Sequence, residues 1–417
     1  MLAKFFPQGF QRYQSLPVLG PIIDRYACWL HDQHYTWRSA RYELRMACRA
    51  DEYLNGRAVS RIDDLTQQDL DECHQWLRRR SPKEAGAVHV LARFLRESGE
   101  IETPVAPPPA SGADSYVHAF MAHLGEVRGY ADSTVRRHGQ IAREFLEWVC
   151  VAEEPERLSA LTTKEIEAFI GHLSKRMGRI GLQKPIAIIR NFLRFLAADG
   201  TVPTGLDSMI DSPRVYRQEQ LPRALPWSTV EALLASIDRT SAIGLRDFAM
   251  FSLMTTYGMR ACDVVALTLE DIQWRSGLIC IRQSKTGKPL VLPLTDQISR
   301  ALQDYFKQVP RDGVHRQVFL RLRAPSGVLK PTAVIEAFQS WSSRSGLEIP
   351  FKGAHCIRHS YALHLLRQGV SLKTIGDLLG HRSPESTTVY LRLATEDLRS
   401  VALPLPVPCP VGPEAPR

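Results

Sequence analysis

The sequence predicts a mostly α-helical protein of several domains that carries one small β-hairpin. Apolar residues recur at three- and four-residue spacing along most of the 417-residue chain, a pattern typical of amphipathic helices. Two proline-containing stretches interrupt the pattern, and one pair of short β-rich runs flanks a turn that contains glycine. At about 100–200 residues per domain, a chain of this length forms two to four domains.

An N-terminal helical domain is predicted for residues 1–101. Its expected helices cover residues 22–30, 40–54, 67–77 and 87–95. Residues 102–113 follow, and their consecutive prolines lack backbone donors and favour extended structure. This stretch is therefore interpreted as a semi-rigid linker.

A second helical domain is predicted for residues 114–211, with helices at residues 116–124, 133–149, 163–173 and 185–196. Ser133 or Thr134 is the expected N-cap of the second of these helices, and Thr162 with Glu165 is expected to form a capping box at the third. Residues 212–226 mix prolines with charged residues and are interpreted as another linker.

The two helical blocks also match each other in sequence. Asp64-Leu65-Thr66 corresponds to Ala160-Leu161-Thr162, and the anchors around residues 93–99 and 194–200 each contain Arg-Phe-Leu followed by glycine. The spacing drifts by several residues between these anchors, so a chance match of two four-helix patterns is the alternative. We interpret residues 1–101 as a degenerate duplicate of the second domain.

A third domain with mixed structure is predicted for residues 227–402. Two β-rich runs, 278–282 and 289–293, flank residues 284–288 and predict a hairpin. Residues 403–417 contain six prolines and are expected to form an irregular tail. Helices are expected at residues 229–237, 242–257, 298–308, 332–345, 356–368, 371–379 and 384–393.

Composition excludes several classes of protein. The chain is 44% apolar and 23% charged, which argues against a disordered or collagen-like chain. No segment approaches the roughly 18 apolar residues of a membrane span, and the start lacks the apolar run of a signal peptide. The eight cysteines form no Cys-x-x-Cys pair, as expected for a reduced protein. We therefore expect a cytoplasmic protein with no membrane partner.

The positive charge is concentrated in the C-terminal half. Residues 218–417 hold 24 basic and 17 acidic side chains, an excess of 7 out of the net charge of +9. Residues 1–105 are close to neutral, with 15 basic and 14 acidic side chains. The imbalance favours a polyanionic partner for the C-terminal half, with a moderately basic surface as the alternative.

Six residues of the third domain are of types that suit attack on a phosphodiester. No His-Glu-x-x-His, EF-hand, Gly-x-Ser-x-Gly or phosphate-cradling loop occurs, so hydrolysis driven by a metal or ATP loses support and no metal ligands are predicted. Guanidinium groups bind phosphate bidentately, and nearby cations stabilise the phenolate of tyrosine, otherwise a poor nucleophile. Taken singly, each residue also has an ordinary structural explanation. The six are Arg260, Lys285, His355, Arg358, His381 and Tyr390.

The surroundings of the first two residues support a catalytic interpretation. Gly258 is expected to end a helix, so that Arg260 projects from the next helix start and Asp263, three residues on, orients it. Lys285 is expected at the hairpin tip, where its long side chain can protonate a leaving oxygen.

The remaining four residues also lie in suitable local patterns. His355 and Arg358 are three residues apart and share one face of a predicted helix. Gly380 is expected to end another helix and leave His381 on a turn, nine residues before Tyr390.

Together these residues resemble the tyrosine recombinase (integrase) family in order, spacing and local sequence. The Leu-Leu-Gly-His-x-Ser run, with a tyrosine nine residues beyond its histidine, is the strongest part of the match. The resemblance covers about residues 115–400. It implies a helical, SAM-like core-binding domain at 114–211, which closes a clamp around duplex DNA, and an α+β catalytic domain at 227–402.

The resemblance also implies a mechanism. Tyr390 would attack the scissile phosphate and form a 3′-phosphotyrosyl link, while Lys285 protonates the released 5′-oxygen. Arg260 and Arg358 would hold the nonbridging oxygens. The two histidines of the set would serve in proton transfer and hydrogen bonding, with the division between them open. The bond energy stays in the phosphotyrosine, so no cofactor, metal or ATP is expected.

The partners implied by the resemblance are double-stranded DNA with specific recombination sites and three further copies of the chain. Four protomers would exchange DNA strands through a Holliday junction intermediate, alone or with other recombinases. The protein would act in a bacterial cell and be encoded by a mobile element. Residues 391–401 are the expected helix that docks on a neighbouring protomer. The expected DNA-binding side chains are Arg136, Arg137, Lys184, Arg190 and Lys288.

Alternatives remain open for the whole chain and for its first domain. The chain could be a DNA-binding helper subunit whose own catalysis is dispensable, or a relative that relaxes DNA as type IB topoisomerases do. Residues 1–101 could contact DNA or other proteins. Their near-neutral charge favours protein contacts, although four arginines recur at helical spacing, namely Arg38, Arg41, Arg45 and Arg49.

Overall fold

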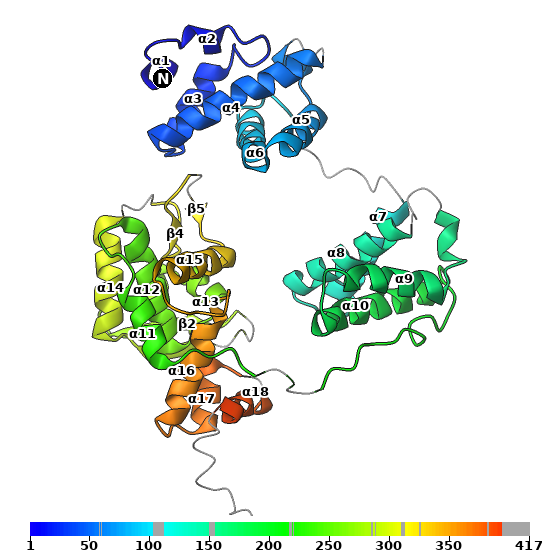
Figure 1. Ribbon diagram of the computed structural model, residues 1–417, viewed down its shortest axis with the longest axis vertical. Coiled ribbons are helices and arrows are strands. Elements are labelled where there is room, and N and C mark those ends of the chain that lie inside the picture. Colours follow the sequence, from blue (N-terminus) through cyan, green and yellow to red (C-terminus); the bar gives the residue numbers. More distant parts are fainter. Residues whose placement is uncertain are drawn as a thin grey trace, which may run out of the picture. The chain divides into compact units, whose positions relative to one another are not determined.

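The computed structural model is mostly helical with small antiparallel sheets, which confirms the predicted fold class (Figure 1). It describes residues 1–57, 59, 61–102, 112–149, 155–216, 219, 221–284, 287, 289–309, 313–324, 327–381 and 383–393. Most of the first predicted linker and the whole predicted tail lie outside these residues. Hydrophobic side chains form separate cores in the blocks that end near residues 101, 210 and 393.

The first block contains the four expected helices and two short ones that the sequence did not predict. Thr36 caps α4 by accepting from the Ser39 amide, and Thr66 forms a capping box with Asp69 at the start of α5. Helix α6 packs against both α4 and α5. The helices are α1 (Leu2–Phe5), α2 (Gln11–Gln14), α3 (Ile23–Asp32), α4 (Trp37–Gly56), α5 (Gln67–Arg80) and α6 (Pro82–Glu97).

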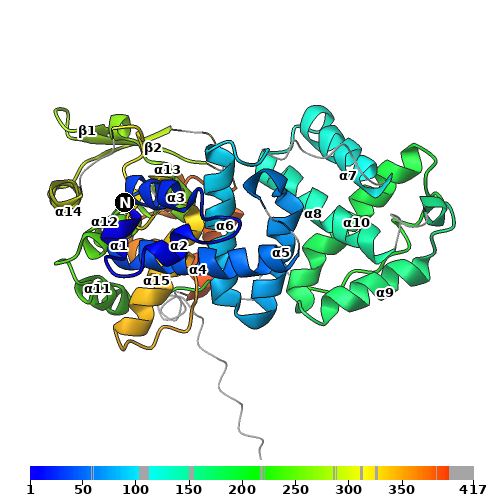
Figure 2. The same ribbon diagram turned by 90° about the horizontal axis from the view of Figure 1, so that it is seen from above.

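The second block is a four-helix bundle in which α8 and α10 lie side by side (Figure 2). The predicted capping box of Thr162 and Glu165 is confirmed. The bundle contains α7 (Gly112–Ala122), which continues into a π-helical turn at His123–Val127, then α8 (Asp132–Trp148), a 3₁₀ turn at Pro155–Leu158, α9 (Thr163–Ser174) and α10 (Arg179–Ala198).

Two expected helix starts in this bundle are wrong. Helix α8 begins at Asp132 with Ala131 as N-cap, so Ser133 and Thr134 lie within its first turn and cap nothing. Helix α10 begins six residues before the expected start and contains Pro185 in its interior. Proline commonly begins helices, but here burial of its ring against the bundle outweighs the lost amide donor.

The two helical blocks share local features at corresponding places. Thr66 and Thr162 cap α5 and α9 with the same box. Gly99 and Gly200 follow α6 and α10 with φ of +77° and +71°. These parallels extend the sequence match from residue identity to backbone geometry.

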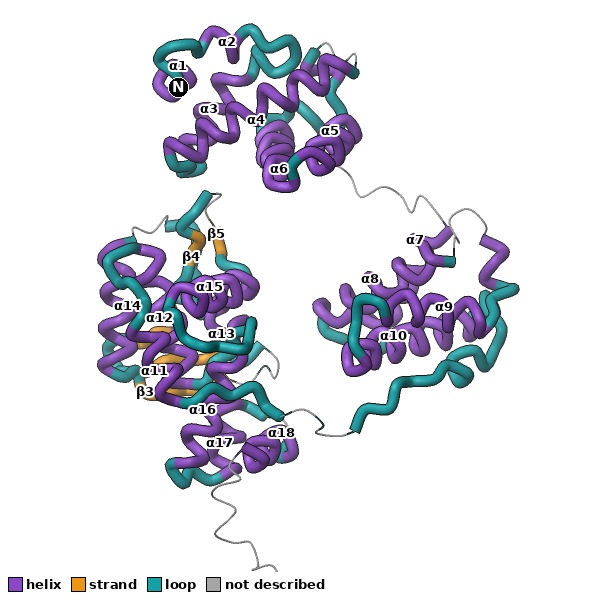
Figure 3. The backbone as a smooth tube through the Cα atoms, in the orientation of Figure 1, coloured by secondary structure: helices purple, strands orange, loops and turns teal. Residues whose placement is uncertain are grey.

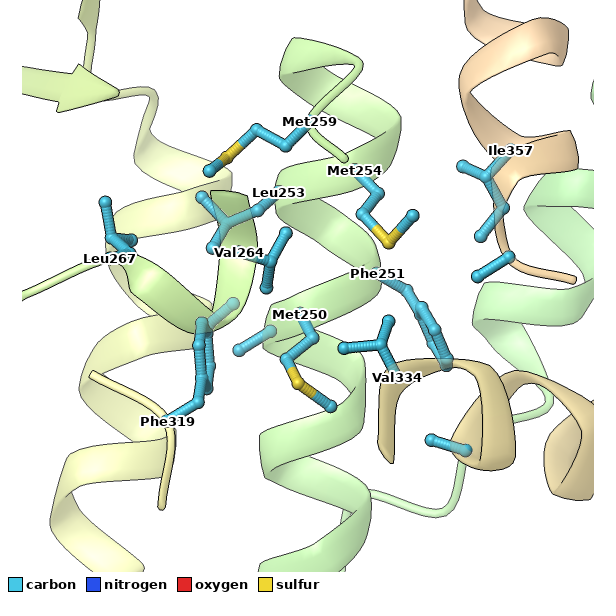
Figure 4. Close-up of a cluster of buried hydrophobic side chains, with 14 of the residues drawn as sticks. Met250, Phe251, Leu253, Met254, Met259, Val264, Leu267, Phe319, Val334 and Ile357 are labelled. Atoms are coloured by element: carbon cyan, nitrogen blue, oxygen red, sulfur yellow. The ribbon is translucent and has the colours of Figure 1, made fainter. Parts of the chain in front are cut away.

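The third block is built around α12, whose side chains are buried on almost every face (Figure 4). Met250 and Phe251 of α12 lie among side chains from neighbouring elements, such as Val264, Phe319 and Val334. The helices are α11 (Trp227–Ala235), α12 (Ala242–Tyr257), α13 (Ala261–Ala266), α14 (Asp296–Gln308), α15 (Pro331–Arg344), α16 (His355–Arg367), α17 (Leu372–Leu379) and α18 (Glu385–Thr388), then a 3₁₀ helix at Val389–Leu393.

The predicted hairpin is confirmed with its predicted bounds. Strands β2 (Leu278–Arg282) and β3 (Pro289–Pro293) pair antiparallel, with Leu278 opposite Pro293 and Arg282 opposite Pro289. A third strand, β1 (Ile272–Gln273), pairs with β2 on its other side. Figure 3 shows the strands in orange among the helices. Strands β4 (Leu320–Arg321) and β5 (Gly327–Val328) form a separate pair. Strands of two residues show no alternation, so the sequence did not predict them.

The described residues contain no helix that is both long and apolar enough to cross a membrane. Six described cysteines are free thiols, and Cys150 and Cys409 lie outside the described residues.

Candidate active site

Two helix ends bring a pair of arginines together. Gly258 ends α12 with φ of +63°, and Arg260 follows as the N-cap of α13. Arg358 of α16 is 3% exposed and donates through Nη1 to the Gly258 carbonyl at 2.6 Å. Its Nη2 donates to the carbonyl of Leu379, to which Arg260 Nη2 also donates at 3.4 Å. The two guanidinium groups, 98 residues apart in the chain, therefore meet at one carbonyl oxygen.

The paired cations are only partly compensated. Burial, and then the charge of Arg260, lowers the pKa of Arg358 to about 10, which leaves it protonated at neutral pH. Asp263 Oδ2 lies 3.7 Å from Arg260 Nη1. Within the described part of the chain, that buried nitrogen has no hydrogen-bond partner. A buried guanidinium donor without a hydrogen-bond partner, beside a second arginine, suits an anion with several acceptor oxygens, such as phosphate.

Asp263 connects this arginine pair to the hairpin. Its Oδ1 accepts hydrogen bonds from the Ser284 amide at 2.8 Å and from the Ser284 hydroxyl at 2.7 Å. Ser284 directly precedes Lys285, which lies outside the described residues together with Lys288. Asp263 thus anchors the first residue of the turn rather than serving the arginine alone.

Tyr390 lies in the 3₁₀ helix after α18 and is only 2% exposed. It packs in a small cluster with Tyr361, Ile375 and Leu379. Burial raises the pKa of its phenol, although the charges of the two arginines oppose this shift. The phenol oxygen lies 3.1 Å from His359 Nδ1.

Three histidines lie in a series of ring contacts that reaches Tyr390. The His381 ring lies nearly parallel to the Tyr390 ring at 6.4 Å, and its Nδ1 lies 2.7 Å from the Thr387 hydroxyl. His355 is exposed at the first position of α16, and its ring meets the His359 ring edge-on at 4.6 Å. His359 is the residue that the sequence reasoning missed. Its position directly after Arg358 could have indicated a role. However, adjacent helix residues point about 100° apart, so the spacing did not place His359 on the same face as Arg358.

The structure thus gathers Arg260, His355, Arg358, His381 and Tyr390 within one region of the third block. They come from the start of α13, from α16 and from the segment after α17. Among the described residues, no cluster of histidine, cysteine or carboxylate side chains has the composition of a metal site.

The expected DNA-binding residues of the second block divide into two pairs. Arg137 and Lys184 line a pocket of about 640 Å³ between α8 and α10, beside Arg128 and Arg194. Arg136 is exposed outside this pocket lining and donates to the Asp132 carbonyl at 3.4 Å, while Arg190 donates to the carbonyl of Ile210.

Replacing Gly258 by alanine is expected to destabilise the third block. The loss should exceed the cost of placing an alanine in the left-handed conformation. A left-handed alanine costs about 1–2 kcal/mol. A Cβ here would also lie 2.6 Å from Tyr361 Cδ1 and 2.7 Å from Leu379 Cδ2, and such overpacking adds about 1–3 kcal/mol. Gly277→Ala is the matched control, because its φ is +64° and nothing lies within 4 Å of the added atom. Equal losses of unfolding free energy in urea would contradict the packing argument.

Several known proteins are similar to this chain. Residues 223–397 match the model described as "Phage integrase family", and residues 117–200 match "Phage integrase, N-terminal SAM-like domain". The chain is 30% identical over 406 residues to a putative integrase/recombinase, y4rA, of Sinorhizobium fredii, covering 94% of this chain and 96% of that protein. It is 28% identical to the tyrosine recombinase XerD of Lacticaseibacillus casei, covering 68% and 95%. A lambda integrase tetramer bound to a Holliday junction has a similar fold, with a TM-score of 0.51, 20% identity and coverage of 75% and 86%.

Proposed function

Because the chain belongs to the phage integrase family of tyrosine recombinases, we propose that it cuts and rejoins DNA at specific sites through a covalent bond to Tyr390. The observation that carries this proposal is the meeting of Arg260 and Arg358 beside the buried Tyr390, with one guanidinium nitrogen lacking a hydrogen-bond partner in the described chain. This arrangement suits a scissile phosphate.

In the proposed reaction, the guanidinium groups bind the nonbridging oxygens and stabilise the charge that develops on them. The phenol oxygen of Tyr390 attacks phosphorus and displaces the 5′-oxygen, leaving a 3′-phosphotyrosyl bond. Lys285 is the proposed donor of a proton to the 5′-oxygen, and Asp263 holds the turn that precedes it in the chain. His355 and His381 assist by proton transfer and hydrogen bonding. The protein's own cations supply the positive charge, so the proposed reaction uses no cofactor.

The test is the trapping of a covalent adduct on nicked substrates that carry the ends of the mobile element, in buffer with a chelator. We expect a protein–DNA band that resists denaturation and leaves a free 5′-hydroxyl. Specific binding without an adduct, even with candidate partner recombinases present, would favour a helper subunit. Relaxation of plasmids that lack the sites would favour a topoisomerase-like activity.

We also propose that four protomers assemble on two paired sites and exchange strands through a Holliday junction, in the cytoplasm of a bacterium. The fold shared with a lambda integrase tetramer on such a junction supports this assembly. Residues 391–401 are the proposed docking helix, of which residues 394–401 lie outside the described residues. Synaptic complexes on paired sites should have the mass of four chains, and removal of residues 394–417 should abolish them.

The pocket between α8 and α10 is the proposed DNA contact of the second block. Changing Arg137 or Lys184 to glutamine should weaken DNA binding at all sequences, because each change removes one phosphate contact. Each should also make the fall of the log binding constant with log salt concentration less steep, by about 0.9 in slope. Lys175→Gln is the control, since Lys175 is an exposed cation at the end of α9 and outside the pocket lining. Slopes that fall equally in all three variants would contradict the assignment.

The first block is proposed to be a degenerate copy of this core-binding domain. Support comes from the shared capping boxes and from the left-handed glycines after α6 and α10. In each block a left-handed residue is also followed by tyrosine, at His34-Tyr35 and at Gly129-Tyr130. Its role is proposed as protein contact during assembly. Footprints of the full chain and of a chain lacking residues 1–101 provide the test, because a shorter protected region in the truncated chain would favour DNA contact instead.

A further inference from the structure

A histidine outside the expected catalytic set contacts the proposed nucleophile directly. His359 Nδ1 lies 3.1 Å from the Tyr390 phenol oxygen, and the two rings are 5.7 Å apart. His359 is on α16, one residue after Arg358, whereas Tyr390 lies beyond α18. The contact therefore joins the helix that carries the phosphate-binding arginine to the segment that carries the nucleophile.

The other two histidines make different contacts. His381 Nδ1 lies 2.7 Å from the Thr387 hydroxyl, and its ring stacks over Tyr390 at 6.4 Å rather than facing the phenol oxygen with a nitrogen at hydrogen-bond distance. His355 packs edge-on against His359 at the exposed start of α16. Of the hydrogen bonds in the described chain that involve these rings, the one to the phenol is made by His359.

The resting protonation states supply a proton donor at the tyrosine and a neutral acceptor at the histidine. Burial, followed by electrostatic interactions with His355, Arg358, His381 and Arg223, lowers the pKa of His359 to about 4. The ring is therefore neutral at neutral pH and holds one bare nitrogen. Burial raises the pKa of Tyr390, which keeps its hydroxyl protonated. In the tautomer with hydrogen on Nε2, the hydroxyl donates to Nδ1.

We propose that His359 accepts the hydroxyl proton of Tyr390 during attack on the scissile phosphate and returns it when the strand is rejoined. This inference rests on the proposed function. A lone pair of the phenol oxygen forms the new O–P bond while its proton moves to Nδ1, which makes His359 an imidazolium. The P–O5′ bond breaks with its electron pair on the 5′-oxygen, which takes a separate proton from the acid proposed at Lys285.

The substrate itself makes this transfer easier. A phosphodiester held by Arg260 and Arg358 places a negative charge beside cations that otherwise disfavour an imidazolium. Bound DNA therefore raises the basicity of His359 at the moment when the phenol oxygen begins to bond to phosphorus. In the absence of DNA, burial and the nearby charges keep the ring neutral, with its nitrogen available to accept a hydrogen bond from the phenol.

The test compares His359→Asn and His359→Leu with the wild-type chain on nicked substrates. Asparagine keeps an acceptor near the Nδ1 position but cannot take a proton, while leucine removes the acceptor. We expect the adduct to form about 10²- to 10⁴-fold more slowly in both variants, the range typical of general acid–base catalysis, with DNA affinity unchanged. His364→Asn, on the same helix, is the control and should react like wild type.

A second substrate separates the two proton transfers. With a bridging sulfur in place of the 5′-oxygen, the leaving thiolate needs no proton, so Lys285→Ala should recover its rate while His359→Asn should not. Wild-type rates for His359→Asn, or its recovery on the sulfur substrate, would overturn the inference while the wild-type adduct upholds the proposed function. A wild-type chain that forms no adduct on the element's ends would overturn the proposed function and this inference with it.

Discussion

Replacing Tyr390 by phenylalanine is expected to abolish covalent adduct formation, with a fall in cleavage rate of about 10⁴-fold or more, as is typical for loss of a nucleophile. The ring stays in its cluster with Ile375 and Leu379, so the loss in stability should be limited to about 1–2 kcal/mol for the hydrogen bond to His359. The measurement is the amount of denaturation-resistant adduct on nicked DNA over time, with affinity followed in parallel.

Tyr361→Phe is the matched control for this variant. Tyr361 is a buried tyrosine of the same hydrophobic cluster, on α16. Because it has no place in the proposed reaction, the control should form adduct at the wild-type rate. An adduct that persists in the Tyr390 variant would place the nucleophile elsewhere in the chain.

Replacing Arg358 by lysine is expected to impair both stability and cleavage, although the charge is kept. The guanidinium donates to the carbonyls of Gly258 and Leu379 through two different nitrogens. Lysine has a single terminal nitrogen, which cannot reproduce both bonds. Loss of one charge-assisted bond in a buried site corresponds to about 1.5–3 kcal/mol of unfolding free energy. Loss of a preorganised donor to the transition state corresponds to a fall in cleavage rate of about 10²- to 10³-fold.

Urea unfolding and single-turnover cleavage measure the two effects separately, at a temperature where the variant remains folded. Arg367→Lys is the control, since Arg367 is an exposed arginine near the end of the same helix. If Arg358→Lys cleaved at the wild-type rate, a point charge would be sufficient and the bidentate role would be wrong.

The sequence was sufficient to predict the fold class and most of the long helices, because burial of one helix face imposes a recurring pattern of apolar residues. The family was predicted from the order and spacing of the six candidate catalytic residues. The β2–β3 hairpin had a signal of its own, two β-rich runs around a glycine turn. Shorter elements had none. Strand β1 has two residues and α1 has four, so neither is long enough to repeat its period.

The site was predictable in its residue types and less so in its contacts. The helix ends at Gly258 and Gly380, both left-handed, agree with the expectation. His359 was not foreseen, because its contact with Tyr390 joins segments 31 residues apart, and such a contact depends on how α16 and the last segment pack. The same holds for the contact of Asp263 with Ser284, because its shortest described bonds are to Ser284 rather than to Arg260, three residues before it.

The two prolines of β3 limit how copies of this chain can associate. The strand order leaves β3 at one edge of the described sheet and β1, only two residues long, at the other. The free backbone groups of an edge strand can pair with a strand of another chain. In β3, the backbone nitrogens of Pro289, Val291 and Pro293 lie on the same side of the strand, and the two prolines have no N–H to donate. This edge is thus protected from edge-to-edge aggregation between copies of the chain.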